Sequence, residues 1–337
     1  MQDNIIVSVV IPVFNTSQYL DQCLSSVLNQ TYANIEVICV NDASTDNSLE
    51  ILNAWAQKDH RIVIIDSQIN KGQGWARNLA IRKARGQYIG IVDSDDFISM
   101  DMYESLIANS SNCTADIVVG NVYAYHSDKN QNIYNFTSEI EDVITIKRSI
   151  LVNGCRMSTS IIRKSIFSNY NLWYPEGVIY EDNANSAPIF LIANKINICY
   201  NSEPFYFYRI NNVSTTRSLN NTRCWDRLLT ANMFLNHTKR LNLYETYKEE
   251  IDYSYWSLYV KNSIIYAIFS FTRYQYGKVK DFIREYNKMS GGLSMIRKNI
   301  YYTQDRTLQK YICAVICTFP LMGYLIKGAQ RIKNRFK

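Results

Sequence analysis

The chain has 337 residues, a formal net charge of +6, 47% hydrophobic residues and 20% charged residues. This composition excludes a globally disordered chain and is sufficient for one large domain or two of ordinary size. The N-terminus lacks the features of a secretory signal peptide, and the eight cysteines include no CxxC pair. With three histidines spread along the chain, a zinc site is not expected. We therefore expect a cytoplasmic protein with reduced cysteines.

The first hundred residues alternate between predicted strands and helices. Apolar, β-branched runs predict buried strands at 7–13, 35–40, 61–66 and 87–93. Segments with helical spacing or helix-start residues lie between them, at 17–30, 44–57 and 72–84. Strands joined by such helices predict right-handed βαβ units in a mostly parallel sheet, which is an α/β fold with helices on both faces. In such sheets, ligands bind beyond the carboxyl ends of the strands.

Three carboxylates, those of Asp93, Asp95 and Asp96, follow the fourth predicted strand in "QYIGIVDSDDF". In an extended segment Asp93 and Asp95 point the same way, so their repulsion favours a cation between them. Mg²⁺ or Mn²⁺ fits, because these ions use one or two carboxylates and complete their coordination with phosphates and water. The alternative is a helix N-cap cluster before a helix starting near residue 97, which accounts for Asp96 but not for Asp93.

Two more polar residues are expected at the same edge of the sheet. Asp42 ends the second strand, where its carboxylate would accept a hydrogen bond from a nucleobase; alternatively, it is a turn residue. Arg77 lies in the helix that follows the glycine-containing "NKGQGW"; alternatively, it is a surface charge. Taken together at neighbouring strand ends, these residues predict a pocket for a nucleotide whose diphosphate binds a metal ion.

The rest of the chain is less regular. Strand-like segments occupy 115–126, 156–167 and 196–210, and a loop leads into a helix within 177–195. From about residue 220 onward we expect three to five helices. Residues 218–337 contain 20 basic and 8 acidic residues, whereas residues 1–217 contain 16 basic and 22 acidic ones. A basic end of this kind suggests a polyanionic partner, either nucleic acid or an anionic membrane surface.

The segment 311–326 contains 16 residues without a charge, and the basic stretch "KGAQRIKNRFK" follows it. Its length is slightly short of the roughly 17–25 residues that a membrane-spanning helix needs. A short apolar helix before a basic tail is typical of interfacial docking, so residues 311–337 are predicted to bind an anionic membrane surface. The alternative is an ordinary packed C-terminal helix with a solvated tail.

Four segments in this order, "VSVVIPVFN", "VNDASTDNS", "NKGQGWARNLAI" and "VDSDD", resemble the donor-binding half of glycosyltransferase family 2, which has the Rossmann-like GT-A fold. The resemblance continues less tightly to about residue 217. It implies a catalytic domain over 1–217, divided into a nucleotide-sugar-binding half (1–110) and an acceptor-binding half (111–217). Residues 218–337 would form a helical, basic region.

The resemblance also implies an activity. The donor would be a nucleotide-sugar, of the UDP type, and a divalent cation, Mn²⁺ or Mg²⁺, would assist transfer with inversion at the anomeric carbon. The acceptor would be a hydroxyl of a glycan or lipid-linked glycan, as in bacterial capsule or O-antigen synthesis. Membrane docking would place the enzyme at the inner face of the cell membrane.

The resemblance assigns roles to individual residues. Those that would bind the nucleotide-sugar are Pro12, Val13, Phe14, Asn15, Asp42, Gly72, Arg77, Asp93 and Ser94. Asp95 would ligate the metal together with Asp93. In "YEDN", Asp182 would be the general base and Glu181 would orient acceptor or donor; alternatively, both acids serve a helix dipole. Arg209, Ser214 and Arg217 would clamp the diphosphate.

Other enzyme classes remain open. A nucleotidyltransferase would also use a nucleotide and Mg²⁺. A phosphatase of the haloacid dehalogenase type would carry its DxD after the first strand, whereas this chain has it after the fourth. A nucleic-acid-binding protein would use the basic C-terminal half but would leave the acidic cluster without a role, so no nucleic-acid partner is expected.

Overall fold

The structure is a computed structural model that describes residues 6–120, 122–125, 131–134, 142–154, 157–199, 205–209 and 221–335. The chain divides into two compact units. The first comprises Met1–Lys147 and Cys155–Ile210, and the second comprises Arg148–Gly154 and Asn211–Lys337. The domain boundary expected at residue 217 lies outside the described residues, and the division into 1–217 and 218–337 stays a prediction.

The first unit is built on a seven-stranded sheet, as far as the described residues show, with the order β10-β6-β9-β4-β1-β2-β3. Neighbouring strands are parallel except at β9, which is antiparallel to β4 and β6. The strands are β1 (Val7–Val13), β2 (Ile35–Asp42), β3 (Ile62–Ser67), β4 (Tyr88–Ile91), β6 (Ile117–Val119), β9 (Ser160–Arg163) and β10 (Ile196–Ile198). The four strands predicted from the apolar runs of the first hundred residues are confirmed as β1 to β4.

A smaller sheet in the same unit has the order β5-β11-β7-β8 within the described segments. Its strands are β5 (Phe97–Ile98), β11 (Tyr206–Arg209), β7 (Val122–Tyr125) and β8 (Gln131–Tyr134). β11 pairs antiparallel with β5 and parallel with β7. Since β5 follows the Asp93–Asp96 turn directly, β11 is brought to the same place as the acidic cluster.

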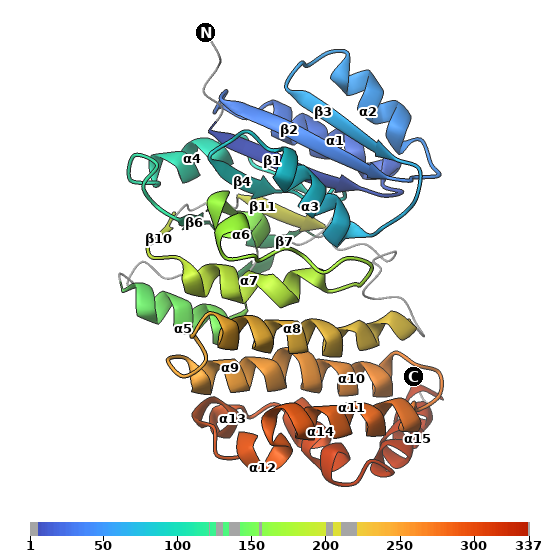
Figure 1. Cartoon of the computed structure of the whole chain (residues 1–337). Helices are drawn as coiled ribbons and strands as arrows, with labels where there is room; N and C mark the ends of the chain where they lie inside the picture. The colour runs from blue at the N-terminus through green and yellow to red at the C-terminus, as the bar shows by residue number, and fades with distance from the viewer. Residues whose placement is uncertain are drawn as a thin grey trace. The chain divides into compact units, whose positions relative to one another are not determined.

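Helices cover the large sheet, which is why β1 and β2 are buried along their whole length. They are α1 (Ser17–Leu28), α2 (Ser48–Ala56), α3 (Gln73–Lys83), α4 (Met102–Ala108), α6 (Ser165–Asn169) and α7 (Glu181–Ile192), with a 3₁₀ turn η1 (Met157–Thr159). α3 packs across β1 and β2 (Figure 1). Because the strand order reverses between β3 and β4, right-handed crossovers place α3 on the face opposite α1 and α2. α5 (Val143–Asn153) crosses from the first unit into the second.

Three local predictions need correction. The predicted strand at 115–126 contains two strands, β6 and β7, separated near Gly120, and the one at 156–167 contains η1, β9 and α6. The helix expected to start near residue 97 starts at Met102 as α4, after the two-residue strand β5. Asp96 therefore does not lie at the start of a helix, as the alternative prediction required.

The described part of the second unit is helical. Its elements are η2 (Thr222–Trp225), α8 (Asp226–Arg240), α9 (Lys248–Ser254), the π-helical η3 (Tyr255–Lys261), α10 (Asn262–Phe269), α11 (Tyr276–Ser290), α12 (Gly292–Ile296), α13 (Ile300–Gln304), α14 (Leu308–Thr318) and α15 (Met322–Arg335). Eight α-helices within residues 221–335 replace the three to five expected, so that prediction was wrong. The core of this unit is aromatic: Trp256, for example, packs against Tyr286 and Tyr302.

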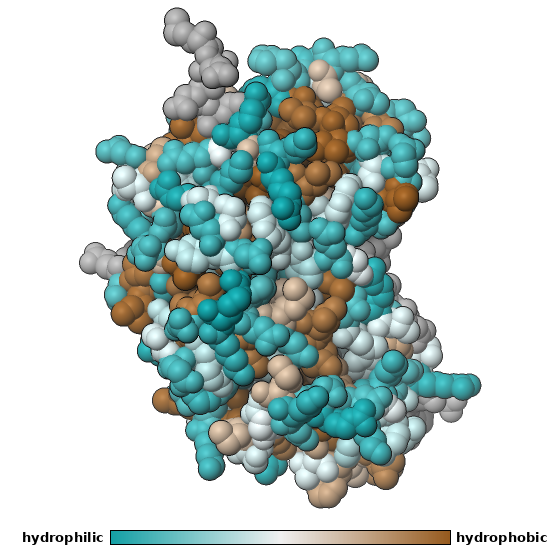
Figure 2. Space-filling view, in the orientation of Figure 1, coloured by the Kyte–Doolittle hydropathy of each residue, from teal (hydrophilic) through white to brown (hydrophobic). Residues whose placement is uncertain are grey.

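Large apolar side chains are exposed along the last two helices. Leu308, Tyr311 and Val315 recur at helical spacing on the exposed side of α14, and exposed Phe319 and Leu325 follow toward and within α15. On the face drawn in Figure 2, scattered hydrophobic residues lie among hydrophilic ones at the lower edge. None of the helices in the described residues has the length and apolarity needed to cross a membrane.

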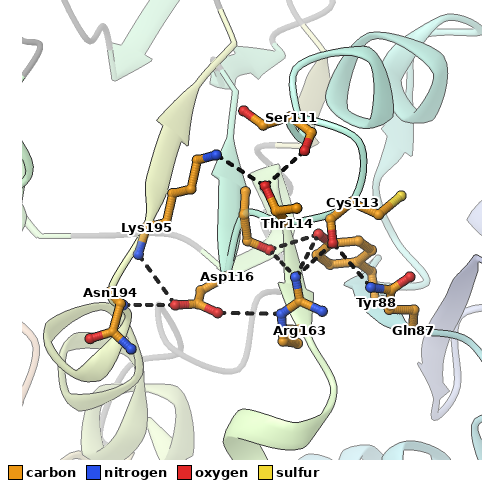
Figure 3. A network of polar contacts seen from close by, with 10 residues as sticks. Gln87, Tyr88, Ser111, Cys113, Thr114, Asp116, Arg163, Asn194 and Lys195 are labelled. Carbon is orange, nitrogen blue, oxygen red and sulfur yellow. Dashed lines mark hydrogen bonds and ion pairs between the residues drawn. The ribbon is translucent and has the colours of Figure 1, made fainter.

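A polar network holds the edge of the large sheet at which β4 begins (Figure 3). The Arg163 guanidinium donates to the carbonyl oxygens of Cys113 and Ala115, both at 2.8 Å, and pairs with Asp116 at 3.3 Å. The Asp116 carboxylate also accepts the backbone N–H groups of Asn194 and Lys195 (2.7 and 3.2 Å). These contacts join the starts of β6 and β10 to the end of the antiparallel β9. They lie at the sheet edge opposite to the Asp93–Asp96 turn and stabilise the fold there.

Candidate functional site

The carboxyl ends of β1, β2 and β4 lie side by side, because these strands are parallel neighbours in the sheet. Val13 at the end of β1 is paired with Asn41 of β2, one residue before Asp42, and the turn containing Asp93 and Asp95 follows β4. The predicted site residues of the first hundred positions therefore gather at one edge. This is the edge at which α/β sheets bind their ligands.

Arg77 connects the two acidic motifs of this edge. Its Nη2 donates to Asp93 Oδ1 at 2.7 Å, and its Nη1 donates to Glu181 Oε1. The guanidinium also lies over the Tyr174 ring, with 5.5 Å between Cζ and the ring centroid. The side chain is only 7% exposed, so Arg77 is not the surface charge that was the alternative prediction. It brings the turn after β4 together with the start of α7, which lies 104 residues after Arg77 in the sequence.

The electrostatics of this cluster follow from its burial. Burial raises the pKa of the Glu181 carboxyl, to about 7, although the Arg77 guanidinium acts to lower it. Two carboxylates share one cation here, and Asp93 is the more exposed of them at 29% against 5%. Burial therefore opposes ionisation of Glu181, while Arg77 favours it. The two partners make the guanidinium harder to deprotonate, because they raise the pKa of Arg77 against the effect of burial.

Asp182 differs from Glu181 in exposure. Glu181 and Asp182 form the first turn of α7, which follows Tyr180 in the left-handed conformation (φ 63°). Glu181 is buried while Asp182 is exposed. Of the two predicted catalytic acids, Asp182 is thus the one accessible to a substrate, and Glu181 is held in the protein interior by Arg77.

Asp42 holds the loop that leads into α3. Its two carboxylate oxygens accept the backbone N–H groups of Lys71 at 2.8 Å and Gly72 at 2.7 Å. Gly72 has φ +88°, a conformation that residues with a side chain rarely adopt. The short distance between Asp42 and Gly72 confirms that these two predicted residues lie together. A hydrogen bond between Asp42 and a nucleobase stays a prediction.

The end of β1 forms the neighbouring part of the edge. Pro12 and Val13 are buried in the strand, whereas Phe14 is 46% exposed and Asn15 has φ 52°. The Asn15 side chain accepts the backbone N–H of Thr45 at 2.7 Å, which joins this end to the loop after β2. Ser94 is buried and its Oγ lies 3.0 Å from the hydroxyl of Thr16.

Asp96 has structural partners of its own. Its carboxylate accepts the Tyr206 hydroxyl at 2.7 Å and the Arg209 backbone N–H at 2.7 Å. Burial, followed by the nearby Asp93 and Asp95 charges, raises the pKa of Asp96 well above its usual range. The carboxylate thus anchors β11 to the turn and is no helix cap.

The predicted diphosphate clamp is only partly described. Arg209 ends β11, and its Nε donates to the Asp95 carbonyl at 2.9 Å. Its Nη2 donates to the Gln22 side-chain oxygen at 2.6 Å. Ser214 and Arg217 lie outside the described residues.

The two predicted metal ligands, Asp93 and Asp95, form only a partial donor set. In the described segments, no group of three or more His, Cys, Asp and Glu side chains is arranged to hold an ion. One oxygen of Asp93 is paired with Arg77, and Asp95 is half-buried beside it. Such a donor set suits Mg²⁺ or Mn²⁺ only when phosphate oxygens supply further ligands, which is common for these ions.

Sequence reasoning missed several residues that shape the site. The Asn78 amide donates to the Tyr174 carbonyl and accepts the Tyr174 backbone N–H, both at 2.9 Å, which holds the segment before α7 against α3. The sequence feature that could have identified Asn78 is the "ARN" triplet directly after the glycine-containing loop. Tyr206 was also missed, because its aromatic run "FYFYR" reads only as a generic strand.

Comparison with known proteins gives the family. Residues 8–170 match the model of glycosyl transferase family 2. The chain is 32% identical over 225 residues to "Glycosyltransferase GlyG" of Streptococcus pneumoniae serotype 4, covering 63% of this chain and 73% of that protein.

Two solved structures share the fold. The first is S. aureus TarS 1–349 in complex with UDP-GlcNAc, with a TM-score of 0.67 at 17% identity, covering 97% of this chain and 92% of the other. The second is the mannosyltransferase PcManGT from Pyrobaculum calidifontis in complex with GDP-Man and Mn²⁺, with a TM-score of 0.51 at 14% identity, covering 93% and 87%. The protein is a glycosyltransferase with the GT-A fold, and it belongs to glycosyl transferase family 2.

Proposed function

We propose that this enzyme transfers a sugar, with inversion at the anomeric carbon, from a UDP-sugar to a hydroxyl of a glycan or lipid-linked glycan. The observation that carries the proposal is the Arg77 bridge between Asp93 and Glu181. It joins the motif predicted to bind the donor to the motif predicted to supply the base. A nucleotidyltransferase has no need of the second motif, which makes it the weaker alternative.

The donor would bind across the ends of β1, β2 and β4. Pro12, Val13, Phe14 and Asn15 would line the base and ribose; exposed Phe14 offers an aromatic face for this purpose. Asp42, held by the Gly72 loop, would accept the base N–H, and Ser94 would lie beside the ribose. The structural neighbour TarS was solved with UDP-GlcNAc, which supports a uridine nucleotide as the donor group.

A divalent cation, Mn²⁺ or Mg²⁺, would be held by Asp95 and Asp93 together with the donor diphosphate. When bound, it would offset the negative charge that develops on the departing diphosphate. The neighbour PcManGT was solved with Mn²⁺, which supports this choice of ion. Ser214 and Arg217 would contact the same diphosphate, and Arg209 would be close to it.

Asp182 would act as the general base. Its exposed carboxylate would take the proton from the acceptor hydroxyl while the oxygen forms a bond to the anomeric carbon and the bond to the diphosphate breaks. One in-line displacement of this kind inverts the anomeric centre. Glu181, held by Arg77, would orient the acceptor or the donor.

Residues 311–337 would hold the enzyme on an anionic membrane at the cytoplasmic face. The exposed side chains Leu308, Tyr311, Val315, Phe319 and Leu325 supply an apolar surface. Residues 286–337 contain ten lysines and arginines and a single acid, Asp305, which is paired with Lys261. Apolar contact and positive charge together favour anionic lipid. This position suits a lipid-linked acceptor in bacterial capsule or O-antigen synthesis.

The test is a donor screen. The protein is incubated with a panel of UDP-, GDP- and dTDP-sugars, each with Mn²⁺ or with EDTA, and release of the nucleoside diphosphate is measured. We expect release from a UDP-sugar, only with the metal ion. Release from no nucleotide-sugar, together with pyrophosphate release from a nucleoside triphosphate, would instead favour the nucleotidyltransferase.

A further inference from the structure

The acidic turn is held in place from one side by β11. The Tyr206 hydroxyl accepts the Asp93 backbone N–H at 3.1 Å and donates to Asp96 Oδ2 at 2.7 Å. Tyr206 is fully buried, so this hydroxyl has no competing water. A single phenol group therefore fixes both ends of the four-residue turn.

Arg209 makes the second set of contacts to this turn. Its backbone N–H donates to Asp96 Oδ1 at 2.7 Å, and its Nε donates to the Asp95 carbonyl at 2.9 Å. Its Nη2 donates to Gln22 in α1 at 2.6 Å. The guanidinium of Arg209 thus donates through Nε to the backbone of the turn and through Nη2 to a neighbouring helix.

Aromatic rings keep this arginine in one conformation. The Arg209 guanidinium lies over Tyr19, with 4.8 Å from Cζ to the ring centroid, and over Phe97 at 5.4 Å. Phe97 itself stacks on Phe207 at 4.6 Å between centroids. These contacts come from α1, β5 and β11, so the turn is supported by three separate elements.

We propose that Tyr206 and Arg209 are positioning residues: they fix the backbone of the Asp93–Asp96 turn, aim the Asp95 carboxylate, and thereby set the affinity for a divalent cation that binds with a nucleoside diphosphate. The inference rests on the proposed function in assuming that this cation binds at Asp95. Groups that orient metal ligands without touching the ion commonly contribute about 10–100-fold to metal affinity. Arg209, predicted from the sequence to clamp the diphosphate, here acts through Asp95.

The two roles of Arg209 predict opposite results for a lysine substitution. A diphosphate clamp needs a positive charge, which Arg209→Lys retains. Positioning needs donors in the fixed directions of a guanidinium, which a lysine ammonium does not reproduce. Tyr206→Phe removes the hydroxyl alone and leaves every charge in place, so it tests positioning without any effect on charge.

The experiment measures binding of Mn²⁺ to the full chain in the presence of saturating UDP, with free Mn²⁺ followed by electron paramagnetic resonance. The variants are Tyr206→Phe, Arg209→Lys and Arg209→Met. The matched controls are Tyr88→Phe, whose buried hydroxyl bonds the Ala115 carbonyl at the opposite sheet edge, and Arg82→Met, whose guanidinium lies over Trp173. All three test variants should bind Mn²⁺ about tenfold more weakly, whereas both controls should bind as the wild type does.

A second measurement needs no ligand. Tyr206→Phe removes the acceptor of the Asp93 amide, so hydrogen exchange at the Asp93–Asp96 turn should be faster than in the wild type and in Tyr88→Phe. Wild-type Mn²⁺ affinity in Tyr206→Phe, or in Arg209→Lys, would overturn the inference, and so would unchanged exchange at the turn. If the wild-type protein binds UDP equally well with and without Mn²⁺, the proposed cation site itself is wrong. This result distinguishes a failure of the proposed function from a failure of the positioning inference.

Discussion

The Nη2 atom of Arg77 lies 2.7 Å from Oδ1 of Asp93, in a site where the arginine side chain is 7% exposed. The other terminal nitrogen of the same guanidinium contacts Glu181. Removing the buried cation from between two carboxylates is costly, because it leaves their negative charges uncompensated. The sheet edge and the start of α7 are therefore coupled through one side chain.

Replacing Arg77 should cost both stability and activity. In Arg77→Met the Asp93 and Glu181 carboxylates lose their shared partner, and we expect the free energy of unfolding to fall by about 3–5 kcal/mol. Arg77→Lys keeps the charge but cannot bridge both acids as a planar guanidinium does, so an intermediate loss is expected. Urea unfolding followed by circular dichroism measures both variants. Arg82→Met is the control for losing an arginine from α3, and equal stability of Arg77→Met and Arg82→Met would contradict the coupling.

Asp182→Asn should separate binding from chemistry. The exposed carboxylate is the proposed base, and its loss should lower kcat by about 10²–10⁴-fold while the affinity for UDP stays near that of the wild type. Steady-state kinetics and UDP titration measure the two quantities. Asp101→Asn is the control, because Asp101 precedes α4 and lies outside the site. If Asp182 served only the dipole of its helix, the two asparagine variants would behave alike.

The pH dependence of stability should reveal the raised pKa of Glu181. Its pKa is about 7 in the folded protein, and its ordinary value is 4.5. Between these values the folded state binds more protons than the unfolded state, so the free energy of unfolding falls as pH rises. This contribution is complete below about pH 4.5 and is lost through about pH 7.

Glu181→Gln lacks this titration, so the stability of the wild type relative to the variant should decline as pH rises across this window. Urea unfolding at several pH values measures the difference. Glu36→Gln is the control: burial acts to raise the pKa of Glu36, but hydrogen bonds from Ser8 and Arg85 leave it lowered, so its contribution has the opposite sign and is lost only as pH falls below the ordinary range. If the free energy of unfolding of the wild type, relative to that of Glu181→Gln, instead rises with pH, the pKa of Glu181 is not raised in the folded protein.

The apolar side chains of α14 and α15 should determine membrane binding. Serine at Leu308, Val315 and Leu325, which are 74%, 39% and 67% exposed, removes this surface without disturbing the core. We expect the triple variant to bind vesicles of phosphatidylglycerol and phosphatidylcholine at least about tenfold more weakly in sedimentation, with UDP binding unchanged. Serine at Met100 and Ile144, also exposed, is the control. A wild-type protein that does not bind these vesicles at low salt would contradict membrane docking.

The strands of the first hundred residues were predictable because each is a continuous apolar run buried on both faces, as Val7–Val13 shows. The position of the acidic turn followed from the same pattern. The pairing of β5 with β11 was not predictable, since it joins two short segments more than a hundred residues apart and no local signal specifies a partner. The burial of Arg77 between Asp93 and Glu181 was not predictable either, because a charged residue in a helix is expected to be exposed until its buried acidic partners are known.

The number of C-terminal helices was underestimated for a more local reason. Asn299 and Thr307 cap α13 and α14 by accepting the backbone N–H groups of Tyr302 and Lys310. Gly291, with φ +71°, separates α11 from α12. These capping signals were present in the sequence, but the apolar spacing that predicts a helix runs through them and hides the breaks.

Binding of UDP to the wild-type protein and to Asp95→Ala, measured by calorimetry with Mn²⁺ and with EDTA, tests the central claim most directly. If the turn after β4 binds a cation and a nucleoside diphosphate, the wild type binds UDP with Mn²⁺, and binding is lost both with EDTA and in Asp95→Ala. Asp101→Asn, which alters an acid outside the site, should retain wild-type binding. Unaltered UDP affinity in Asp95→Ala would contradict the metal–diphosphate site.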